Sequence, residues 1–512
     1  MSNIKWKSIN GRQKMKRRYF LIFVRIFVSV FFIFLDISLV VFAFLRYSVI
    51  LDLYLAVSRV AGIILSYFII NSNIHPEEKI SWIFPLTTVP SLGVFIYLSV
   101  GDLSIGYNLM KKKRIKKRRE YYRMVEDIKE TENDIFFLLS QNKYPFFDAE
   151  CFKWYGMGDE AFEAIINELE LAKGSIYLEF YYLSPGKMLD RLVSVLSEKA
   201  EMGIDVRIIY DDVASSAALS ADSPSRFEAL GIKCRVFSRA SLYLSSELHF
   251  RDHRKIVVID KRTVFIGGVN ISDEYMNKSV GKPYWKDCVL MMKGSVAKSY
   301  NEMFLSMFEE NYRPSYEGCL VNGKGCNERE KAVQPFFSLQ PEDASAVTQA
   351  YFRIISGAER YVWIMTPYLV PGYEIISALV FASESGVDVR IITPHLPDKK
   401  YVHSVTRSHY SYLLSHGVKI YEYTKGFVHS KVAIADGRLC VVGSGNLDFR
   451  SMHILTECGA AIYSHKVIDE IKKDFENTFS ESSMIEHKDL NKSFALTERV
   501  IAFILKPFET LL

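Results

Sequence analysis

At 512 residues the chain has room for two or three domains. Its net charge of +5 is too small for a protein that binds nucleic acid over its whole surface, and the basic residues instead cluster beside apolar stretches. The seven cysteines are scattered and include no C-x-x-C pair, which argues against a disulfide framework and against a structural zinc site.

The segment 1–105 is predicted to be an N-terminal helical membrane anchor. Apolar runs lie at 19–45, 51–70 and 81–100, and each is long enough to cross a bilayer, which takes about 20 residues. The run at 81–100 contains no charged residue and fits a membrane span best. A cleavable signal peptide is disfavoured, because the first run is too long and lacks a small-residue cleavage site.

Basic clusters flank this anchor, at 14–18 and at 111–119 (KKKRIKKRR). The positive-inside rule places both clusters in the cytoplasm, which requires an even number of crossings. We therefore expect a multi-pass protein with two crossings, one run lying in the interface, and the following domains in the cytoplasm. The linker 106–145 is expected to attract anionic lipid through its basic block, although a plain stop-transfer signal fits the block equally well.

From about residue 146 the composition becomes that of an α/β protein, with short β-branched runs alternating with amphipathic stretches. An internal repeat divides this region. GIDVRIIYD (203–211) matches GVDVRIITP (386–394), and HRKIVVID (253–260) matches HSKVAIAD (429–436). Two further pairs, at 231–237 with 417–423 and at 264–270 with 441–446, keep the same order. We predict two copies of one α/β unit, with mixed sheets flanked by helices, at 146–332 and 333–485.

The last segment, 486–512, is amphipathic and is expected to dock on a membrane or on a domain.

Each repeat carries one histidine, one lysine and one aspartate at the same spacing. These candidate catalytic residues are His253, Lys255, Asp260, His429, Lys431 and Asp436. Side chains two apart in a strand point to the same face, so each His–Lys pair can reach one ligand. The aspartate lies beyond the end of the strand, is less constrained, and could instead be a structural acceptor. A single H-x-K is weak evidence, but two copies at the same place in a repeat favour catalysis.

A small-residue turn follows each motif and ends in an asparagine. The candidate substrate-binding residues in these turns are Gly268, Asn270, Ser444 and Asn446. Glycine lets the backbone approach a ligand closely, and serine and asparagine supply uncharged donors. A pseudo-twofold axis would bring both sets around one cavity.

That set of groups suits a phosphodiester. The lysines and asparagines would neutralise the non-bridging oxygens as the transition state forms. One imidazole could attack phosphorus, while the other protonates the departing alkoxide and later deprotonates the incoming alcohol. A covalent phosphohistidine needs no metal, and we expect neither a metal nor a cofactor.

These residues resemble the phospholipase D superfamily, and with the apolar N-terminal runs the chain is similar to bacterial cardiolipin synthases in particular. RDHRKIVVID (251–260) and GGVNISDEY (267–275) resemble the first catalytic segment of that family. FVHSKVAIAD (427–436) and GSGNLDFRSMHILTE (443–457) resemble the second. The resemblance covers nearly the whole chain.

The resemblance implies that two phosphatidylglycerol molecules give cardiolipin and glycerol through a phosphatidyl-histidine, at a bacterial cell membrane. His253 would be the nucleophile and His429 the acid and base, although the two could be exchanged. By the same resemblance Glu457 would orient His429, and Asp287 would be the acidic partner of the first half. The implied partners are phosphatidylglycerol and anionic membrane lipid, with no nucleic acid.

Two other interpretations use the same residues. The first is a phosphodiester hydrolase, a phospholipase or a nuclease, in which water attacks in place of a lipid alcohol. The apolar runs favour lipid over nucleic acid as its substrate. The second is a catalytically inactive membrane scaffold, which the intact histidines, lysines and asparagines of both repeats argue against.

Overall fold

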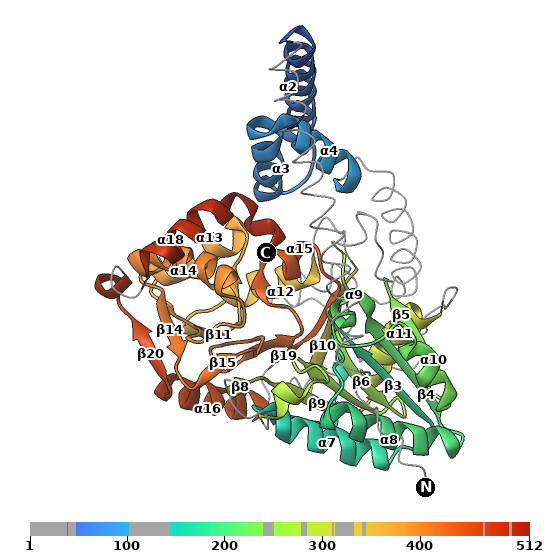
Figure 1. The fold of residues 1–512 in the computed structure, drawn as a ribbon. Helices are drawn as coiled ribbons and strands as arrows, with labels where there is room; N and C mark the ends of the chain where they lie inside the picture. The colour runs from blue at the N-terminus through green and yellow to red at the C-terminus, as the bar shows by residue number, and fades with distance from the viewer. Residues whose placement is uncertain are drawn as a thin grey trace.

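The computed structural model describes residues 48–101, 146–238, 250–277, 284–309, 332–339, 345–463, 466–490 and 494–512, together with residues 38, 144 and 312. Apart from two of these single residues, the predicted apolar run at 19–45 and the basic linker at 106–145 lie outside the described residues. Figure 1 shows two α/β units side by side, with the N-terminal helices projecting from one side of them.

Helix α2 (Ser48–Ile70) is the longest helix in the described part of the anchor. Its segment Asp52–Ile70 has a mean hydropathy of 2.0 and is the one helix of the described residues that is long and apolar enough to cross a membrane. A helix of 23 residues is about 34 Å long, slightly more than the hydrocarbon core of a bilayer. Most of its large apolar side chains are exposed, so the protein itself does not cover them.

The prediction of a single spanning helix at 81–100 is wrong. The chain forms helix α3 (Pro76–Thr88) and helix α4 (Pro90–Val100), and Val89 between them has a non-helical backbone (φ −134°). The break occurs because Pro90 cannot donate a helix hydrogen bond and disfavours helical geometry in the residue before it. Neither helix, at 13 and 11 residues, is long enough to span by itself.

The three helices pack tightly where glycine allows it. A Cβ atom on Gly62 of α2 would lie 2.5 Å from the carbonyl oxygen of Leu86 in α3. Trp82 and Tyr97 fill a small core between the helices, with their rings 5.1 Å apart. Helices α2 to α4 are therefore one compact unit.

The first α/β unit contains a seven-stranded mixed sheet in the order β2-β9-β7-β6-β3-β4-β5. Strands β3, β4 and β5 are parallel, and β6 runs antiparallel to β3. The strands are β2 (Cys151–Tyr155), β3 (Ser175–Phe180), β4 (Asp205–Asp211), β5 (Lys233–Phe237), β6 (Lys255–Ile259), β7 (Thr263–Gly267) and β9 (Val289–Lys293). The helices of this unit are α7 (Gly158–Glu170), α8 (Lys187–Glu201), α9 (Asp212–Ser215), α10 (Ser223–Ala229), η3 (Asp273–Met276) and α11 (Val296–Phe308).

The second unit contains a nine-stranded sheet in the order β1-β10-β19-β17-β16-β11-β13-β14-β20. Its strands are β1 (Phe147–Asp148), β10 (Ala332–Ser338), β11 (Tyr361–Met365), β13 (Asp388–Pro394), β14 (Lys419–Tyr423), β16 (Val432–Ala435), β17 (Leu439–Gly443), β19 (Glu457–Tyr463) and β20 (Ser482–Ile485). Its helices are α12 (Ala346–Ser356), α13 (Tyr373–Glu384), α14 (Lys400–Ser415), α15 (Phe449–His453) and α16 (Lys466–Ser480). The chain ends in η5 (His487–Asp489), α18 (Leu496–Leu505) and η6 (Lys506–Leu511).

The two sheets repeat one arrangement. The order β7-β6-β3-β4-β5 in the first corresponds to β17-β16-β11-β13-β14 in the second, with the same parallel and antiparallel pairs. The prediction of two mixed α/β units from the internal repeat is therefore confirmed. The exact division of the chain at 332 stays a prediction, and β1, from the start of the first predicted domain, pairs with β10 in the second sheet.

The two units are also joined to each other. Strand β8 (Tyr284–Lys286) of the first pairs in parallel with β15 (Gly426–Val428) of the second. The hydroxyl of Tyr300 in α11 donates to the carbonyl of Gly459 in β19 at 2.8 Å. One hydrophobic core contains buried side chains from both units. Each unit therefore fixes part of the backbone of the other, and the candidate site depends on these contacts.

Candidate active site

Both motif histidines lie where the two units meet. His253 precedes β6, and His429 follows β15; each side chain is buried, with 9% of it exposed. The His253 N–H donates to the carbonyl of Thr456 in the second unit at 2.9 Å, and the His429 N–H donates to the carbonyl of Lys286 in the first at 2.7 Å. The backbone of each histidine is thus held by the opposite unit.

The carboxylates that contact these histidines are exchanged between the repeats. Glu457 Oε1 lies 2.8 Å from His253 Nδ1, and Asp287 Oδ2 lies 2.6 Å from His429 Nδ1. The expectation that Glu457 orients His429, and that Asp287 serves the first half, is therefore wrong. The cause is backbone pairing, because the bridge between Asp252 and Thr456 and the β8–β15 pairing place each carboxylate beside the other repeat's histidine. With Nδ1 engaged, Nε2 of each ring is left for a substrate.

Lys255 and Lys431 complete the same cluster. Each ammonium donates to the carbonyl of its own repeat's histidine, and both side chains are buried. Burial lowers the pKa of Lys255 to about 7 and also lowers that of Lys431. Burial likewise lowers the pKa of His253 to about 4 and that of His429 well below its ordinary value, and the charges of both lysines add to the effect on each histidine. The two histidines and two lysines therefore lie close enough to disfavour one another's protonated forms, and a bound anion would reduce this repulsion.

The two carboxylates differ in charge. Burial alone would raise the pKa of Glu457, but the charge and hydrogen bond of His253, aided by Lys255 and Ser444, lower it. Burial raises the pKa of Asp287 to about 7, and the charge of Lys431 offsets this only in part. Glu457 is thus the firmly ionised acid of the pair.

The small-residue turns explain part of that difference. Ser444 Oγ donates to Glu457 Oε2. The corresponding position of the first repeat is Gly268, where an added Cβ would collide with the Asp287 carboxylate. The glycine lets the carboxylate approach its backbone closely but supplies no side-chain donor. The two turns therefore support their carboxylates differently.

The two asparagines contact neighbouring protein groups. Asn270 accepts from the Tyr182 N–H at 3.1 Å and donates to the Tyr275 hydroxyl at 2.8 Å. Asn446 donates to Asp448 at 2.9 Å, and its buried amide oxygen has no hydrogen-bond partner among the described residues. Both amides hold the loops around the site, and their contact with a substrate stays a prediction.

The motif aspartates do not reach the histidines. Asp260 accepts from the backbone N–H groups of 173–175, and Asp436 accepts from those of 359–361. Each lies past the end of its strand, seven positions from the motif histidine at the strand's start, or about 20 Å of extended chain. Their assignment to the catalytic set is wrong. They are the structural acceptors that the sequence analysis also allowed.

A family model described as cardiolipin synthase, phospholipase D-like domain, matches residues 165–307 and 351–479. The chain belongs to this family. It is 33% identical to a cardiolipin synthase of Geobacillus kaustophilus over 82% of this chain and 86% of the relative. It is 32% identical to cardiolipin synthase 2 of Bacillus cereus over 85% of this chain and 87% of the relative.

A solved structure supports the fold. The phosphatidylserine synthase of Haemophilus influenzae superposes with a TM-score of 0.57 over 74% of this chain and 100% of that chain, at 16% identity. The family match and the relatives named cardiolipin synthase confirm the resemblance to the phospholipase D superfamily, and to cardiolipin synthases within it. An uncharacterized protein of Streptococcus mutans is 34% identical over 86% of this chain and 97% of the relative.

Aromatic side chains surround these phospholipase D-type histidines, and the site residues predicted from the sequence do not include them. The ring of Tyr275 lies 5.6 Å from that of His429, and the Trp285 ring lies 5.5 Å from it. Phe427 also contacts the same imidazole, and Tyr181 lies edge-on to His253 at 4.7 Å. A signal was available, because Phe427 and Trp285 stand two positions before His429 and Asp287, on the same face of an extended chain.

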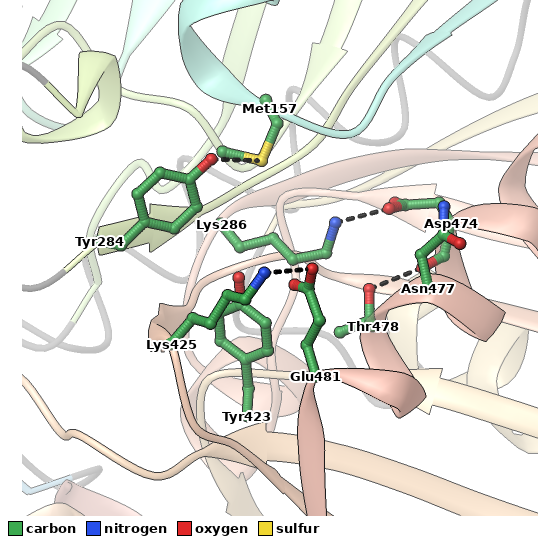
Figure 2. Close-up of a pocket in the computed structure, with 9 residues that line it drawn as sticks. All are labelled: Met157, Tyr284, Lys286, Tyr423, Lys425, Asp474, Asn477, Thr478 and Glu481. Carbon is green, nitrogen blue, oxygen red and sulfur yellow. Dashed lines mark hydrogen bonds and ion pairs between the residues drawn. The ribbon is translucent and has the colours of Figure 1, made fainter.

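A cavity of about 610 Å³ lies between the units, beside β8 and β15 (Figure 2). The Lys286 ammonium on one side forms an ion pair of 2.5 Å with Asp474 of α16 on the other. Lys425 is paired with Glu481 at 2.5 Å. Lys286 immediately precedes Asp287, so the ion pair with Asp474 helps to hold the Asp287–His429 contact in place. The cavity itself is lined by Met157, Tyr284, Lys286, Tyr423, Lys425, Asp474, Asn477, Thr478 and Glu481.

Proposed function

We propose that this chain is a cardiolipin synthase, which transfers a phosphatidyl group from one phosphatidylglycerol to a second and releases glycerol. One observation carries the proposal: two buried histidines, each held at Nδ1 by a carboxylate of the other repeat, share their surroundings with two buried lysines. Such a set can bind a phosphodiester and supply both a nucleophile and an acid. The relatives named cardiolipin synthase support the choice of substrate.

In the first step His253 Nε2 attacks phosphorus, and the bond from phosphorus to the glycerol oxygen breaks. Protonated His429 gives its proton to that oxygen, and glycerol leaves. The two lysines stabilise the charge that develops on the non-bridging oxygens. We assign the nucleophile to His253 because attack leaves its ring positively charged, and ionised Glu457 lies beside that ring.

In the second step a hydroxyl of another phosphatidylglycerol loses its proton to His429, which is now neutral. The resulting oxygen attacks phosphorus, and the phosphorus–nitrogen bond to His253 breaks. Cardiolipin is released, and both histidines return to their starting protonation states. Burial and the charges of both lysines lower the pKa of His429, and a bound phosphodiester would raise it again by placing negative charge beside those lysines.

The proposed location is a bacterial cell membrane, with α2 as a span and the catalytic units in the cytoplasm. A multi-pass arrangement with anionic lipid at the basic linker is part of this proposal. Contacts between the anchor and the second unit support a fixed orientation. The rings of His75, just before α3, and His453 in α15 lie 3.9 Å apart. Only the two-residue strand β18 (Leu447–Asp448) separates α15 from the turn that carries Asn446, so a short stretch of chain connects this anchor contact to the site.

The test is product analysis with the purified full chain and phosphatidylglycerol in mixed micelles. Cardiolipin and glycerol should appear in equal amounts. Phosphatidic acid in place of cardiolipin would instead identify the hydrolase. A labelled phosphatidyl adduct, trapped by acid quench and mapped by mass spectrometry, should lie on the peptide that contains His253. An adduct on His429 would reverse the two histidine roles.

A further inference from the structure

Helix α18 is amphipathic, but its apolar face is exposed and its polar face packs against the protein. Leu496, Val500, Phe503 and Ile504 have the i, i+4, i+7, i+8 spacing of one helix face, and they are 75%, 49%, 82% and 59% exposed. In a globular protein such a face normally packs inward. Here the apolar face points away from the protein, and an apolar face of this kind marks an interaction surface.

The polar side of the same helix faces the second unit. Glu498 forms an ion pair of 3.4 Å with Arg407 of α14. Segment η6 follows α18, and its Glu509 lies 3.2 Å from His409, which is also in α14. These contacts fix the rotation of α18 about its axis, so that its apolar face cannot turn inward without breaking them.

The exposed face is continuous with the membrane anchor. Segment η6 contacts α3, where Ser81 Oγ donates to the Pro507 carbonyl at 2.8 Å and lies 2.7 Å from Thr510 Oγ1. The rings of Phe84 and Phe508 lie 5.5 Å apart. Figure 1 shows α18 on the side of the second unit from which α2, α3 and α4 project.

Helix α13 extends this surface. Its Tyr373 and Phe381 are eight positions apart, on one face, and are 70% and 72% exposed. The Tyr373 N–H donates to Glu77 of α3 at 2.7 Å, so this helix also begins against the anchor. Together the exposed apolar side chains of α13 and α18 form a surface that we call the apolar rim: Tyr373, Phe381, Leu496, Val500, Phe503 and Ile504.

We propose that the apolar rim lies in the headgroup–acyl boundary of the bilayer that α2 enters. This inference rests on the proposed membrane location of α2, and it adds a second, lateral attachment at the far end of the chain. An interfacial helix of this kind buries its apolar face about 5–10 Å into the lipid. The Arg450 guanidinium of α15 donates to the Leu511 carbonyl at 3.1 Å, so the seated C-terminus also holds the helix that follows the second catalytic turn.

The first test uses the full chain reconstituted in phosphatidylglycerol vesicles, with a fluorescent amino acid in place of Phe503. The matched control position is Leu171, which is 68% exposed and directly follows α7. Figure 1 shows α7 on the side of the molecule away from α2. Brominated acyl chains should quench the probe at 503 several-fold more than at 171, and iodide should show the reverse. Equal iodide quenching at both positions would overturn the proposal. A probe at 503 that neither agent reaches would overturn it in favour of a second copy of the chain.

The second test separates this surface from catalysis. Phe503→Glu should lower the rate on phosphatidylglycerol vesicles several-fold and leave the rate on a short-chain, monomeric phosphatidylglycerol unchanged. A loss on both substrates, or on neither, would contradict a docking role. Failure of the proposed synthase activity would remain distinguishable, because the quenching measurement requires no turnover.

Discussion

The two candidate half-sites belong to two copies of one repeat, yet they are not electrostatically equal. In the first, His253 contacts a carboxylate whose pKa is lowered, and Ser444 donates to that carboxylate. In the second, His429 contacts Asp287, whose pKa burial raises to about 7 and beside which the turn carries a glycine. In the proposed mechanism this pseudo-symmetric pair of histidines takes two roles, because the side chains behind the rings differ. The nucleophile needs a permanent negative charge behind it, and the acid–base group needs less.

The largest effect expected is loss of the histidines themselves, and it also tests their division of labour. His253→Ala and His429→Ala should each lower turnover of phosphatidylglycerol about a thousandfold or more. With a phosphatidyl phenol ester, whose leaving group needs no proton, His429→Ala should still give a stoichiometric burst of phenol, and His253→Ala should give none. Burst kinetics on both variants provide the measurement. A burst from His253→Ala alone would exchange the roles.

The carboxylates should give smaller and unequal losses. We expect Glu457→Gln to lower turnover about 100-fold and Asp287→Asn about 10-fold, which is the range found for carboxylates that orient metal-bound histidines. Because Asp287 is ionised mainly above its pKa of about 7, Asp287→Asn should lose more activity relative to wild type at pH 8 than at pH 6. Glu457→Gln should show no such step near neutrality. Equal losses with identical pH profiles would contradict the proposed asymmetry.

Much of this arrangement could be predicted from the sequence, because it depends on local spacing. The H-x-K alternation places His253 and Lys255 on one strand face, and the ordered repeats imply two similar sheets. The exchange of Glu457 and Asp287 could not be predicted in the same way. It depends on backbone pairing between segments that are 204 residues apart for His253 and Glu457, and 142 apart for Asp287 and His429. No local pattern encodes such a pairing.

The break at Pro90 was different, since its signal was present in the sequence. Apolar length alone favoured a span at 81–100, but Pro85 and Pro90 both lie within it. Pro85 is accommodated inside α3, whereas Pro90 begins α4. At this break α4 packs closely against the end of α3. Gly93 permits the contact, because a Cβ atom there would lie 2.6 Å from the Pro85 carbonyl oxygen. Hydrophobic length therefore needs to be weighed together with proline position.

Substitution of the two motif aspartates should change stability more than catalysis, and by different amounts in the two repeats. Asp436→Ala should lower the free energy of unfolding by about 2 kcal/mol and Asp260→Ala by about 1, because each removes a carboxylate that accepts three backbone N–H groups and Asp436 is the more buried. Denaturant unfolding in detergent measures the change. The kcat/KM of the folded fraction should stay close to wild type. A folded variant with abolished activity would return these residues to the catalytic set.

The smallest expected effect comes from the turns that these aspartates begin. Asp260 and Lys261 both have left-handed backbones (φ 52° and 55°), as do Asp436 and Gly437 (φ 55° and 69°). The turns are closed by the Arg262 N–H on the Ile259 carbonyl at 3.0 Å, and by the same bond in the second repeat at 2.9 Å. A lysine is strained there by about 1 kcal/mol, whereas a glycine is not.

Lys261→Gly should therefore stabilise the first unit, although the gain falls to about 0.5 kcal/mol because glycine also gives the unfolded chain more freedom. Gly437→Lys is the matched control. It should destabilise the second unit by about 0.5 kcal/mol, because the backbone strain and the reduced freedom of the unfolded chain act in opposite directions. An added Cβ on Gly437 would lie 3.7 Å from the Tyr361 hydroxyl, which is an ordinary contact, so no steric collision adds to this cost. Unfolding midpoints of the two variants should move in opposite directions. Movement in the same direction would mean that the surroundings of the two turns, and not their backbone geometry, decide which residue each repeat carries.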